Sequence, residues 1–326
     1  MSDEGRRVAV TGASGYVGSR LIESLEDEGE VELVLAMDVR PTAGRLGAKV
    51  TFVQQDVSVP FPRAFASHEI DTVVHLAYVL RQGRNRESNR RVNVGGTTNL
   101  LDACAEAGVR KIVYLSSTSV YGAHPDNPSF LVEGSPARPA RGFQYSEDKA
   151  RSEALIEAFA VERPNTVATI LRCCPVMGPT ADNFIARAFL KPFLVKVRGS
   201  DPAMQFVHED DLMGCIVQCI LEDAPGLYNV AGEGTVRWSE MAAMLERRML
   251  SLPAWLLYPA TDAAWKLRLQ SDSPSVGLDF IRYPWAASTE KIKNELGIEF
   301  RYSSREAWDA YARRRGSSML SRGTGN

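Results

Sequence analysis

The stretch that decides the fold is Val8-Ala9-Val10-Thr11-Gly12-Ala13-Ser14-Gly15-Tyr16-Val17-Gly18. Its apolar start predicts a short strand over Val8–Thr11, and the recurrence of Val17, Leu21 and Leu25 predicts a helix directly after the glycines. Gly12 permits a tight turn, Gly15 lets the backbone approach a pyrophosphate, and Gly18 allows the helix to pack closely on the strand. The stretch therefore predicts the first strand, phosphate loop and helix of a dinucleotide-binding α/β fold.

A carboxylate at the end of the next strand indicates which dinucleotide is bound. The apolar run Val31–Asp38 predicts that strand, and Asp38 is its last residue. A carboxylate there accepts hydrogen bonds from the adenosine ribose hydroxyls and repels a 2′-phosphate. We therefore expect NAD rather than NADP as the cofactor, with Gly12, Ser14, Gly15, Gly18 and Asp38 around it. Arg40 nearby leaves dual specificity open.

Strands and helices alternate along the first half of the chain. Further strands are predicted at 50–57, 72–77, 111–116 and 167–172, and helices at 92–107 and 145–162. This rhythm is typical of a doubly wound parallel (Rossmann) sheet. We expect a dinucleotide-binding domain over 1–175, to which 205–232 returns. A smaller, mainly helical substrate lobe is expected over 176–204 and 233–315, with a disordered tail over 316–326.

Composition excludes several other classes of protein. The chain has 326 residues, of which 44% are hydrophobic and 24% charged, and its formal net charge is -2. This balance does not favour nucleic acid or an anionic membrane as the main partner. The five cysteines show no metal-ligand spacing, so we expect no metal site. Their odd number and the absence of a signal peptide or an apolar run of spanning length predict a cytoplasmic protein without a membrane span.

The pair Tyr145 and Lys149 carries the catalytic prediction. Residues at i and i+4 share one face of a helix, and a nearby ammonium and a cationic nicotinamide ring favour the phenolate of tyrosine. Tyr145 could then exchange a proton with a substrate hydroxyl. The strand at 111–116 runs into Ser117, whose hydroxyl can orient the substrate oxygen toward Tyr145. An ordinary helix face and a hydrogen-bonded turn are the alternatives for these residues.

The segment Asp56-Val57 ends the third predicted strand. One interpretation is that Asp56 contacts the adenine amino group. The other is that this carboxylate only caps a turn.

Taken in order, TGASGYVG, Asp38, DV, HLA, SSTSVYG and YSEDK make the chain resemble the extended short-chain dehydrogenase/reductases, the NAD-dependent epimerases and dehydratases. The resemblance implies that Tyr16 and Val17 present backbone amides to the pyrophosphate. It implies that Asn93 begins a helix near the nicotinamide ribose, and that Lys149 binds this ribose. It further places these residues at the cofactor: Val57, Leu76, Ala77, Val176.

Departures from the family pattern concern the substrate. Pro175 replaces the asparagine that commonly meets the sugar-nucleotide phosphate, and Leu80 stands where related UDP-sugar epimerases carry a lysine. Thr118-Ser119 replaces the Asp-Glu pair of dehydratases. Leu252–Leu269 is rich in Trp, Leu and Ala; it could line an apolar pocket, rest on a membrane or, as favoured, pack in the core of its own lobe.

We therefore expect an NAD-dependent oxidoreductase acting on a secondary alcohol or ketone carbon of a small-molecule substrate, with Ser117, Tyr145 and Lys149 as catalytic residues. A nucleotide-sugar epimerase with tightly bound NAD is the first alternative, and a non-catalytic NAD-binding regulatory protein the second. By analogy with the family, a homodimer would form through the helices at 93–107 and 145–162.

Overall fold

The computed structural model describes residues 5–42, 46–80, 85–191, 193–270 and 272–323. The chain forms two compact units. The first comprises Met1–Ser116, Asp148–Leu171 and Met213–Tyr228, and the second comprises Ser117–Glu147, Arg172–Leu212 and Asn229–Asn326.

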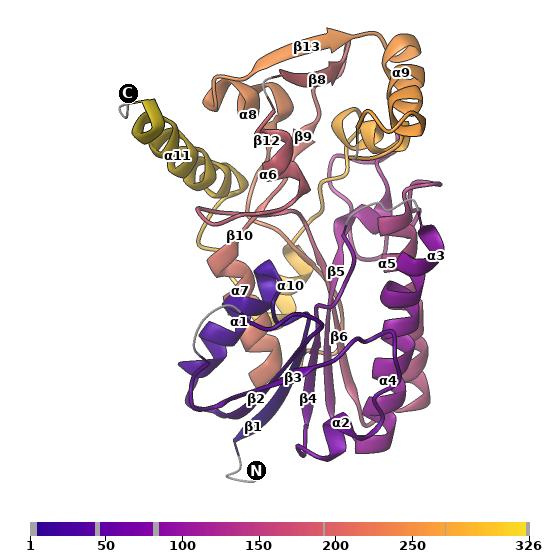
Figure 1. Cartoon of the computed structure of the whole chain (residues 1–326), viewed down its shortest axis with the longest axis vertical. Helices are drawn as coiled ribbons and strands as arrows, with labels where there is room; N and C mark the ends of the chain where they lie inside the picture. The colour runs from indigo at the N-terminus through magenta and orange to yellow at the C-terminus, as the bar shows by residue number, and fades with distance from the viewer. Residues whose placement is uncertain (1–4, 43–45, 81–84, 192, 271, 324–326) are drawn as a thin grey trace. The chain divides into compact units, whose positions relative to one another are not determined.

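A seven-stranded sheet in the order β11-β6-β5-β4-β1-β2-β3 confirms the doubly wound α/β class (Figure 1). The pairs β1–β2, β1–β4, β2–β3 and β4–β5 are parallel. Strands β2 and β3 therefore lie on one side of β1, and β4 lies on its other side. The strands span β1 Arg6–Thr11, β2 Val31–Asp38, β3 Val50–Gln54, β4 Thr72–His75, β5 Lys111–Ser117, β6 Val167–Cys173 and β11 Gly226–Val230.

Helices cover both faces of this sheet. Figure 1 shows α4 (Gly96–Ala107) and α5 (Gln144–Glu162) along one face, and α1 (Tyr16–Glu26) and α7 (Glu209–Leu221) along the other. The central strands are apolar on both sides because both faces are covered, so Val8, Ala9 and Val10 have no exposed surface. Shorter helical segments complete this part of the chain: α2 Arg63–Ala66, α3 Arg86–Arg90 and the π-helix η1 Arg91–Gly95.

The second unit has short strands and several helices around an aromatic core. Trp308 lies 4.6 Å from Phe189 and 5.6 Å from Phe206 between ring centroids, and Phe189 also meets Trp238 at 5.0 Å. Its elements are η2 Thr118–Tyr121, β7 Val176–Met177, α6 Phe184–Ala188, β8 Phe193–Val197, β9 Ala203–Met204, β10 Val207–His208, β12 Val236–Arg237, α8 Trp238–Met244, β13 Arg248–Leu252, α9 Ala254–Lys266, η3 Ser275–Ile281, α10 Glu290–Leu296 and α11 Ser304–Gly323.

Two features of the second unit differ from the sequence expectation. Strand β13 lies inside the segment predicted to be mainly helical, where it pairs in parallel with β8 from Arg248↔Phe193 to Leu252↔Val197. Helix α11, in which alanine and arginine residues before Gly316 favour a helix, continues through Gly323 into the segment predicted to be disordered. The last part of that predicted tail, 324–326, lies outside the described residues.

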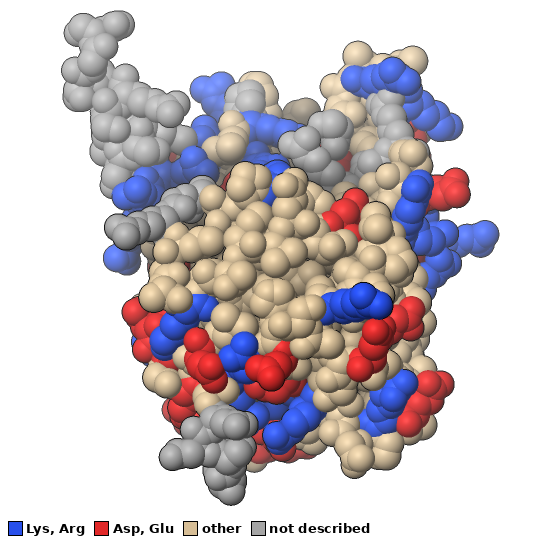
Figure 2. Space-filling view, turned by 60° about the horizontal axis from the view of Figure 1, so that its bottom comes forward, with Lys and Arg blue, Asp and Glu red and all other residues tan. Residues whose placement is uncertain are grey.

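Charged side chains of both signs are interspersed on the face that Figure 2 presents. This agrees with the formal net charge of -2. Among the described residues, no helix combines the length and the hydropathy required to cross a bilayer.

Candidate active site

The glycine loop between β1 and α1 is closely packed against its surroundings. Gly12 has φ +73°, and a Cβ there would lie 2.7 Å from the amide nitrogen of Ala77. A Cβ on Gly18 would lie 2.2 Å from the carbonyl oxygen of Gly12. Only glycine therefore fits at either position, and the loop is held between the end of β4 and the first turn of α1.

The first turn of α1 is suited to an anion. The helix begins after Gly15, which has no side chain to cap the helix, and the first turn contains no acidic residue. The amides of Tyr16 and Val17 are among the first N–H groups of the helix, which have no acceptor within it. Such an end binds phosphate through these N–H groups and the helix dipole. These observations fit the pyrophosphate of a dinucleotide.

Asp38 is fixed in position at the end of β2. Its carboxylate is only 9% exposed, and its two oxygens accept hydrogen bonds from the amide of Ser14 at 3.1 Å and the amide of Arg40 at 3.0 Å. The Ser14 hydroxyl in turn donates to the Arg40 carbonyl at 2.7 Å. Ser14 thus joins the glycine loop to the carboxylate predicted to select the adenosine ribose.

Asp56 lies next to the predicted adenine position but already has a structural partner. Its exposed carboxylate accepts a hydrogen bond from the amide of Ser58 at 2.8 Å, which caps the turn after β3. Val57 is buried, and a Cβ on Gly96 would lie 2.7 Å from its Cγ2. Asp56 thus caps a turn, while its contact with adenine stays a prediction; Val57 packs against the start of α4.

The residues after β4 are hydrogen-bonded to the end of β1. The amides of Leu76 and Ala77 donate to the carbonyl and the hydroxyl of Thr11, at 3.2 and 3.3 Å. The buried Asn93, in η1, accepts from the amide of Val79 at 2.8 Å. Leu76, Ala77 and Asn93 thus belong to one region of the first unit together with the end of β1.

Lys149 is almost completely buried in the first unit. Its ammonium donates to the carbonyl oxygen of Leu115 at 2.6 Å and lies 3.9 Å from the ring centroid of Tyr78 and 4.6 Å from that of Tyr114. These contacts hold the cation beside the end of β5. The aromatic contact with Tyr78 was not predicted, although the sequence HLAY places an aromatic residue just after β4.

Ser117 and Tyr145 lie together in the second unit. The Ser117 hydroxyl accepts from the amide of Ser119 at 3.1 Å and is hydrogen-bonded to the Tyr145 hydroxyl, an interaction that lowers the pKa of the phenol. Burial has the larger effect and raises the pKa of Tyr145 to about 12. The phenolate expected from the sequence is therefore not favoured in the structure as it stands, and Tyr145 carries its proton at neutral pH.

Three further polar residues are buried in the first unit: Ser116, His75 and Glu153. Of these, Glu153 was not predicted as a partner. The hydroxyl of Ser116 is hydrogen-bonded to the buried carboxylate of Glu153, and His75 lies buried at the end of β4. Desolvation, and then the positive charge of Lys149, lower the pKa of His75 to about 3. His75 is thus a neutral structural residue, as expected for a histidine within an apolar strand.

Val176 lies in β7, in the second unit. In the same unit, Thr118, Cys174, Gln205, Trp285 and Ala286 surround a narrow gap that has no room for a water molecule. The buried hydroxyl of Thr118 has no hydrogen-bond partner among the described residues. The Gln205 amide is satisfied by the backbone of Ala287, to which it donates at 3.0 Å and from which it accepts at 2.8 Å.

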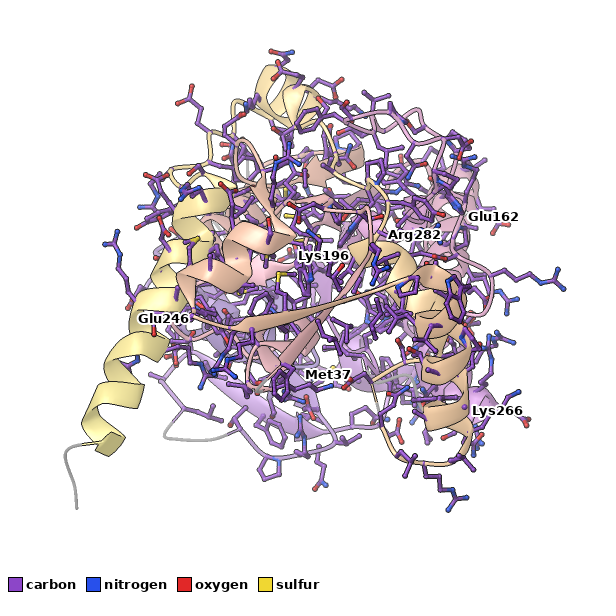
Figure 3. All side chains as sticks on the ribbon, turned by 90° about the horizontal axis from the view of Figure 1, so that it is seen from above. Met37, Glu162, Lys196, Glu246, Lys266 and Arg282 are labelled. Carbon is purple, nitrogen blue, oxygen red and sulfur yellow. The ribbon has the colours of Figure 1, made fainter. Side chains whose placement is uncertain are left out.

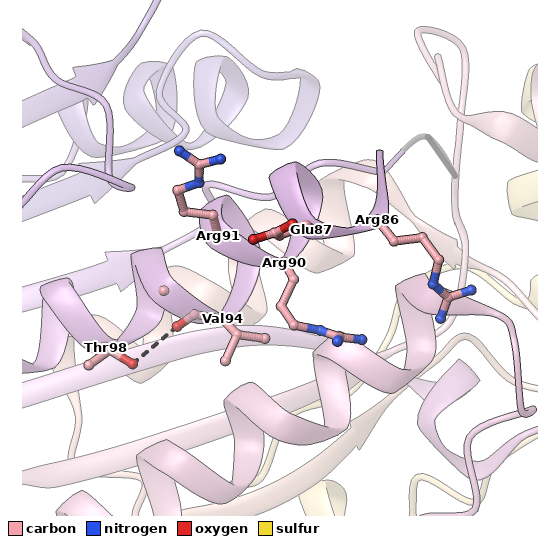
Figure 4. Close-up of a pocket in the computed structure, with 7 residues that line it drawn as sticks. Arg86, Glu87, Arg90, Arg91, Val94 and Thr98 are labelled. Carbon is pink, nitrogen blue, oxygen red and sulfur yellow. Dashed lines mark hydrogen bonds between the residues drawn. The ribbon is translucent and has the colours of Figure 1, made fainter. Parts of the chain in front are cut away.

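A larger open cavity of about 520 Å³ lies elsewhere, along α3, η1 and α4 (Figure 4). None of the predicted site residues lines it. Thr98 on its wall donates to the carbonyl of Val94 at 3.2 Å. The lining residues are Arg86, Glu87, Arg90, Arg91, Val94, Gly95 and Thr98.

No metal centre is found in the part of the chain that the structure describes, where no three His, Cys, Asp or Glu side chains are grouped for an ion. None of the five cysteines, all of which are described and buried, forms a disulfide.

Several known proteins are similar to this chain along most of its length. An uncharacterized protein of Mycobacterium tuberculosis is 28% identical over 321 residues, which cover 96% of this chain and 85% of that protein. Short-chain dehydrogenase/reductase family 42E member 1 of Macaca fascicularis is 28% identical over 226 residues, covering 63% of this chain and 56% of that protein.

Solved structures share the fold. MoeE5 in complex with UDP-glucuronic acid and NAD superposes with a TM-score of 0.74 at 24% identity, covering 96% of this chain and 99% of that one. The UDP-glucose 4-epimerase of Thermotoga maritima with UDP-glucose gives a TM-score of 0.74 at 19% identity, with the same coverage.

The model of the NAD dependent epimerase/dehydratase family matches residues 8–231. This match includes the glycine loop, Asp38, Ser117, Tyr145 and Lys149, and it confirms the resemblance found in the sequence. The chain belongs to the NAD-dependent epimerase/dehydratase family of enzymes, whose cofactor is NAD.

Proposed function

We propose that this enzyme interconverts a secondary alcohol and the corresponding ketone, with Tyr145 as the acid/base. The observation that supports this most strongly is the hydrogen bond between Ser117 and Tyr145. Tyr145 lies on α5, and Lys149 follows it one turn later on the same helix. NAD, when bound, supplies or accepts the hydride. The protein supplies the proton and the orientation of the substrate oxygen.

We propose that the cofactor is held by the glycine loop and Asp38. Gly12, Gly15 and Gly18 allow close approach to the pyrophosphate, and the carboxylate of Asp38 is oriented by two backbone amides. Each oxygen of that carboxylate has further acceptor capacity for a ribose hydroxyl. Its negative charge disfavours the 2′-phosphate of NADP. Tyr16, Val17, Leu76, Ala77, Asn93 and Val176 are the other proposed contacts.

The protonation state of Tyr145 supports proton donation to a ketone oxygen. With a pKa of about 12, the phenol is protonated at neutral pH. In the oxidation direction the phenol must first lose its own proton, so that the phenolate can accept one from the substrate hydroxyl. A nearby positive charge favours this phenolate by lowering the pKa of the phenol. Lys149 is the cation on the same helix that we propose for this role. Ser117 would hold the substrate oxygen against the Tyr145 hydroxyl.

The substrate we propose is less polar than a nucleotide sugar. Pro175 cannot donate a hydrogen bond to a phosphate at this position. Leu80 stands where related UDP-sugar epimerases carry a lysine, and Thr118-Ser119 stands where dehydratases carry an Asp-Glu pair. These departures from the family pattern support an uncharged alcohol or ketone.

A nucleotide-sugar epimerase with tightly bound NAD remains the second candidate. Its support is the likeness of the fold to the two UDP-sugar complexes, which extends over 96% of this chain in each case. The product ketone would then be reduced again on its other face, with the same residues in use.

A panel of substrates distinguishes the two functions. Purified enzyme is incubated with NAD and either apolar secondary alcohols or UDP-, GDP- and dTDP-sugars, while NADH absorbance and product NMR are followed. We expect NADH to accumulate with an apolar alcohol. A sugar epimer formed without net NADH would instead establish the epimerase.

We also propose a homodimer through α4 and α5, and a cytoplasmic location supported by the five cysteines without disulfides. Light scattering coupled to size exclusion tests the dimer: a monomeric mass would refute it.

A further inference from the structure

Helix α9 presents an apolar face to solvent. Trp255 is 77% exposed and Leu256 is 42% exposed at the start of the helix, and Leu267 and Leu269, just past its end, are 69% and 76% exposed. Pro259, Ala260 and Ala263 are exposed between them. At 100° per residue, the exposed helical positions fall on one continuous side.

Two polar residues of α9 face the protein instead. The Tyr258 hydroxyl donates to the carboxylate of Asp279 at 2.6 Å. The carboxylate of Asp262 accepts from the amide and the hydroxyl of Ser275 at 2.8 and 2.9 Å. Leu257 is buried against Val197 and Leu278. The inner side of the segment therefore packs in the core of its own unit, as favoured, whereas the outer side stays exposed.

Positive charge lies at the end of the exposed apolar face, and the exposed Asp272, three residues beyond Leu269, is ion-paired with Lys191. Lys266 and Arg268 are exposed at the end of the helix, and Arg248 is exposed on β13, the strand that leads into α9. Figure 3 shows Lys266 at the far end of α9. The one acidic residue of the helix, Asp262, is held inward by Ser275. An apolar face bordered by cations is complementary to a surface that is apolar inside and anionic at its edge.

We propose that α9 docks this enzyme on the surface of an anionic lipid bilayer. Trp255 and Leu256 would enter the interface between headgroups and acyl chains, where tryptophan is favoured because its ring is apolar and its N–H is polar. Lys266 and Arg268 would contact the anionic headgroups. The helix lies on the bilayer and does not cross it. The proposal does not depend on the reaction that the enzyme catalyses.

The test uses the full chain and two vesicle preparations, phosphatidylcholine alone and phosphatidylcholine mixed with phosphatidylserine. Co-sedimentation is measured for the wild type, for Trp255→Ser/Leu256→Ser and for Lys266→Glu/Arg268→Glu. Val132→Ser is the matched control, because Val132 is a 51% exposed apolar residue outside the catalytic, cofactor and dimer positions proposed above. Thermal unfolding and NAD binding confirm that each variant is folded.

We expect the wild type to bind the anionic vesicles and to bind more weakly at high salt. Each double variant should lose ~10-fold or more in affinity, since it removes two apolar side chains or reverses two charges. Val132→Ser should bind as the wild type does. Failure of the wild type to bind anionic vesicles overturns the proposal, as does an equal loss for Val132→Ser. Dissociation of a dimer by Trp255→Ser/Leu256→Ser without any lipid binding would assign the face to a second copy of the chain.

Discussion

His75 is a buried imidazole that we expect to remain neutral well below the ordinary pKa of histidine. Its Nδ1 lies 2.8 Å from the Thr11 hydroxyl and its Nε2 lies 3.1 Å from that of Thr97. The Thr97 hydroxyl donates its proton to the carbonyl of Asn93, so it must accept from Nε2–H. The neutral ring with its proton on Nε2 therefore satisfies both neighbours, and Nδ1 accepts from Thr11.

The cost of acidification follows from the difference in pKa between the folded and unfolded chain. Burial and the charge of Lys149 lower the pKa of His75 from 6.5 to about 3. Below pH 6.5 the unfolded chain binds a proton that the folded protein does not, so the stability of the fold decreases as pH falls, until the folded pKa is reached. At pH 5 the loss from this residue is ~2 kcal/mol, that is, 1.36 kcal/mol for each pH unit below 6.5.

The assay compares the wild type with His75→Gln, whose amide does not titrate. The chain has four histidines, so their imidazole NMR signals can be followed separately, and the variant assigns the signal of His75. We expect this signal to remain that of a neutral ring at pH 5. Between pH 7.5 and pH 5, the unfolding free energy of the wild type should also fall by ~2 kcal/mol relative to that of the variant. A titration midpoint near 6.5, with no such shift, would refute the reasoning.

Three further substitutions test the cofactor and catalytic residues. Gly18→Ala places a Cβ against the carbonyl of Gly12, so NAD affinity measured by calorimetry should fall ~10-fold or more; unchanged affinity would contradict the close packing of the loop. Asp38→Ala removes the charged acceptor for the ribose hydroxyls, so NAD binding should weaken ~10-fold. It also removes the charge that repels the 2′-phosphate, so NADP binding should strengthen. Tighter binding of NADP than of NAD by the wild type would disprove the assignment. Lys149→Met removes the cation that donates to Leu115, and turnover should fall ~100-fold, whereas an unchanged rate would exclude Lys149 from the reaction.

The sheet could be predicted from the sequence because its strands are buried on both faces. Segments such as Val31–Asp38 and Lys111–Ser117 are nearly continuous apolar runs, which identifies parallel strands between helices. Strand β13 could not be predicted in this way. Arg248, Leu250 and Ser251 are exposed, so the strand lacks the buried apolar run of the central strands and depends on its pairing with β8.

The site residues were predictable where chemistry requires one residue type at one place. Gly12 and Gly18 are fixed by distances that only glycine tolerates. The protonation of Tyr145 was not predictable, because the sequence reveals the helical spacing of Lys149 but not the burial of the phenol, which has the largest effect on its pKa. The second role of Asp56, as a turn cap, likewise depends on a local hydrogen bond to the backbone.

The exposed face of α9 shows why composition alone was ambiguous in the second unit. A segment rich in tryptophan and leucine normally packs inside a domain. Here Leu257 packs inward against Val197 and Leu278. Tyr258 and Asp262 also face inward and form hydrogen bonds within the unit. Trp255 and Leu256 are consequently left on the outside. The direction in which each side chain points, rather than the composition, decides what the helix can contact.

The most direct test of the proposed function is the turnover of Tyr145→Phe on the substrate that the panel identifies. The variant keeps the aromatic ring and lacks only the hydroxyl that is bonded to Ser117. The proposed mechanism predicts unchanged NAD affinity and thermal stability, with turnover reduced by a factor of ~10²–10⁴ because the proton donor is gone. Turnover equal to that of the wild type would show that Tyr145 is not the acid/base and would contradict the mechanism.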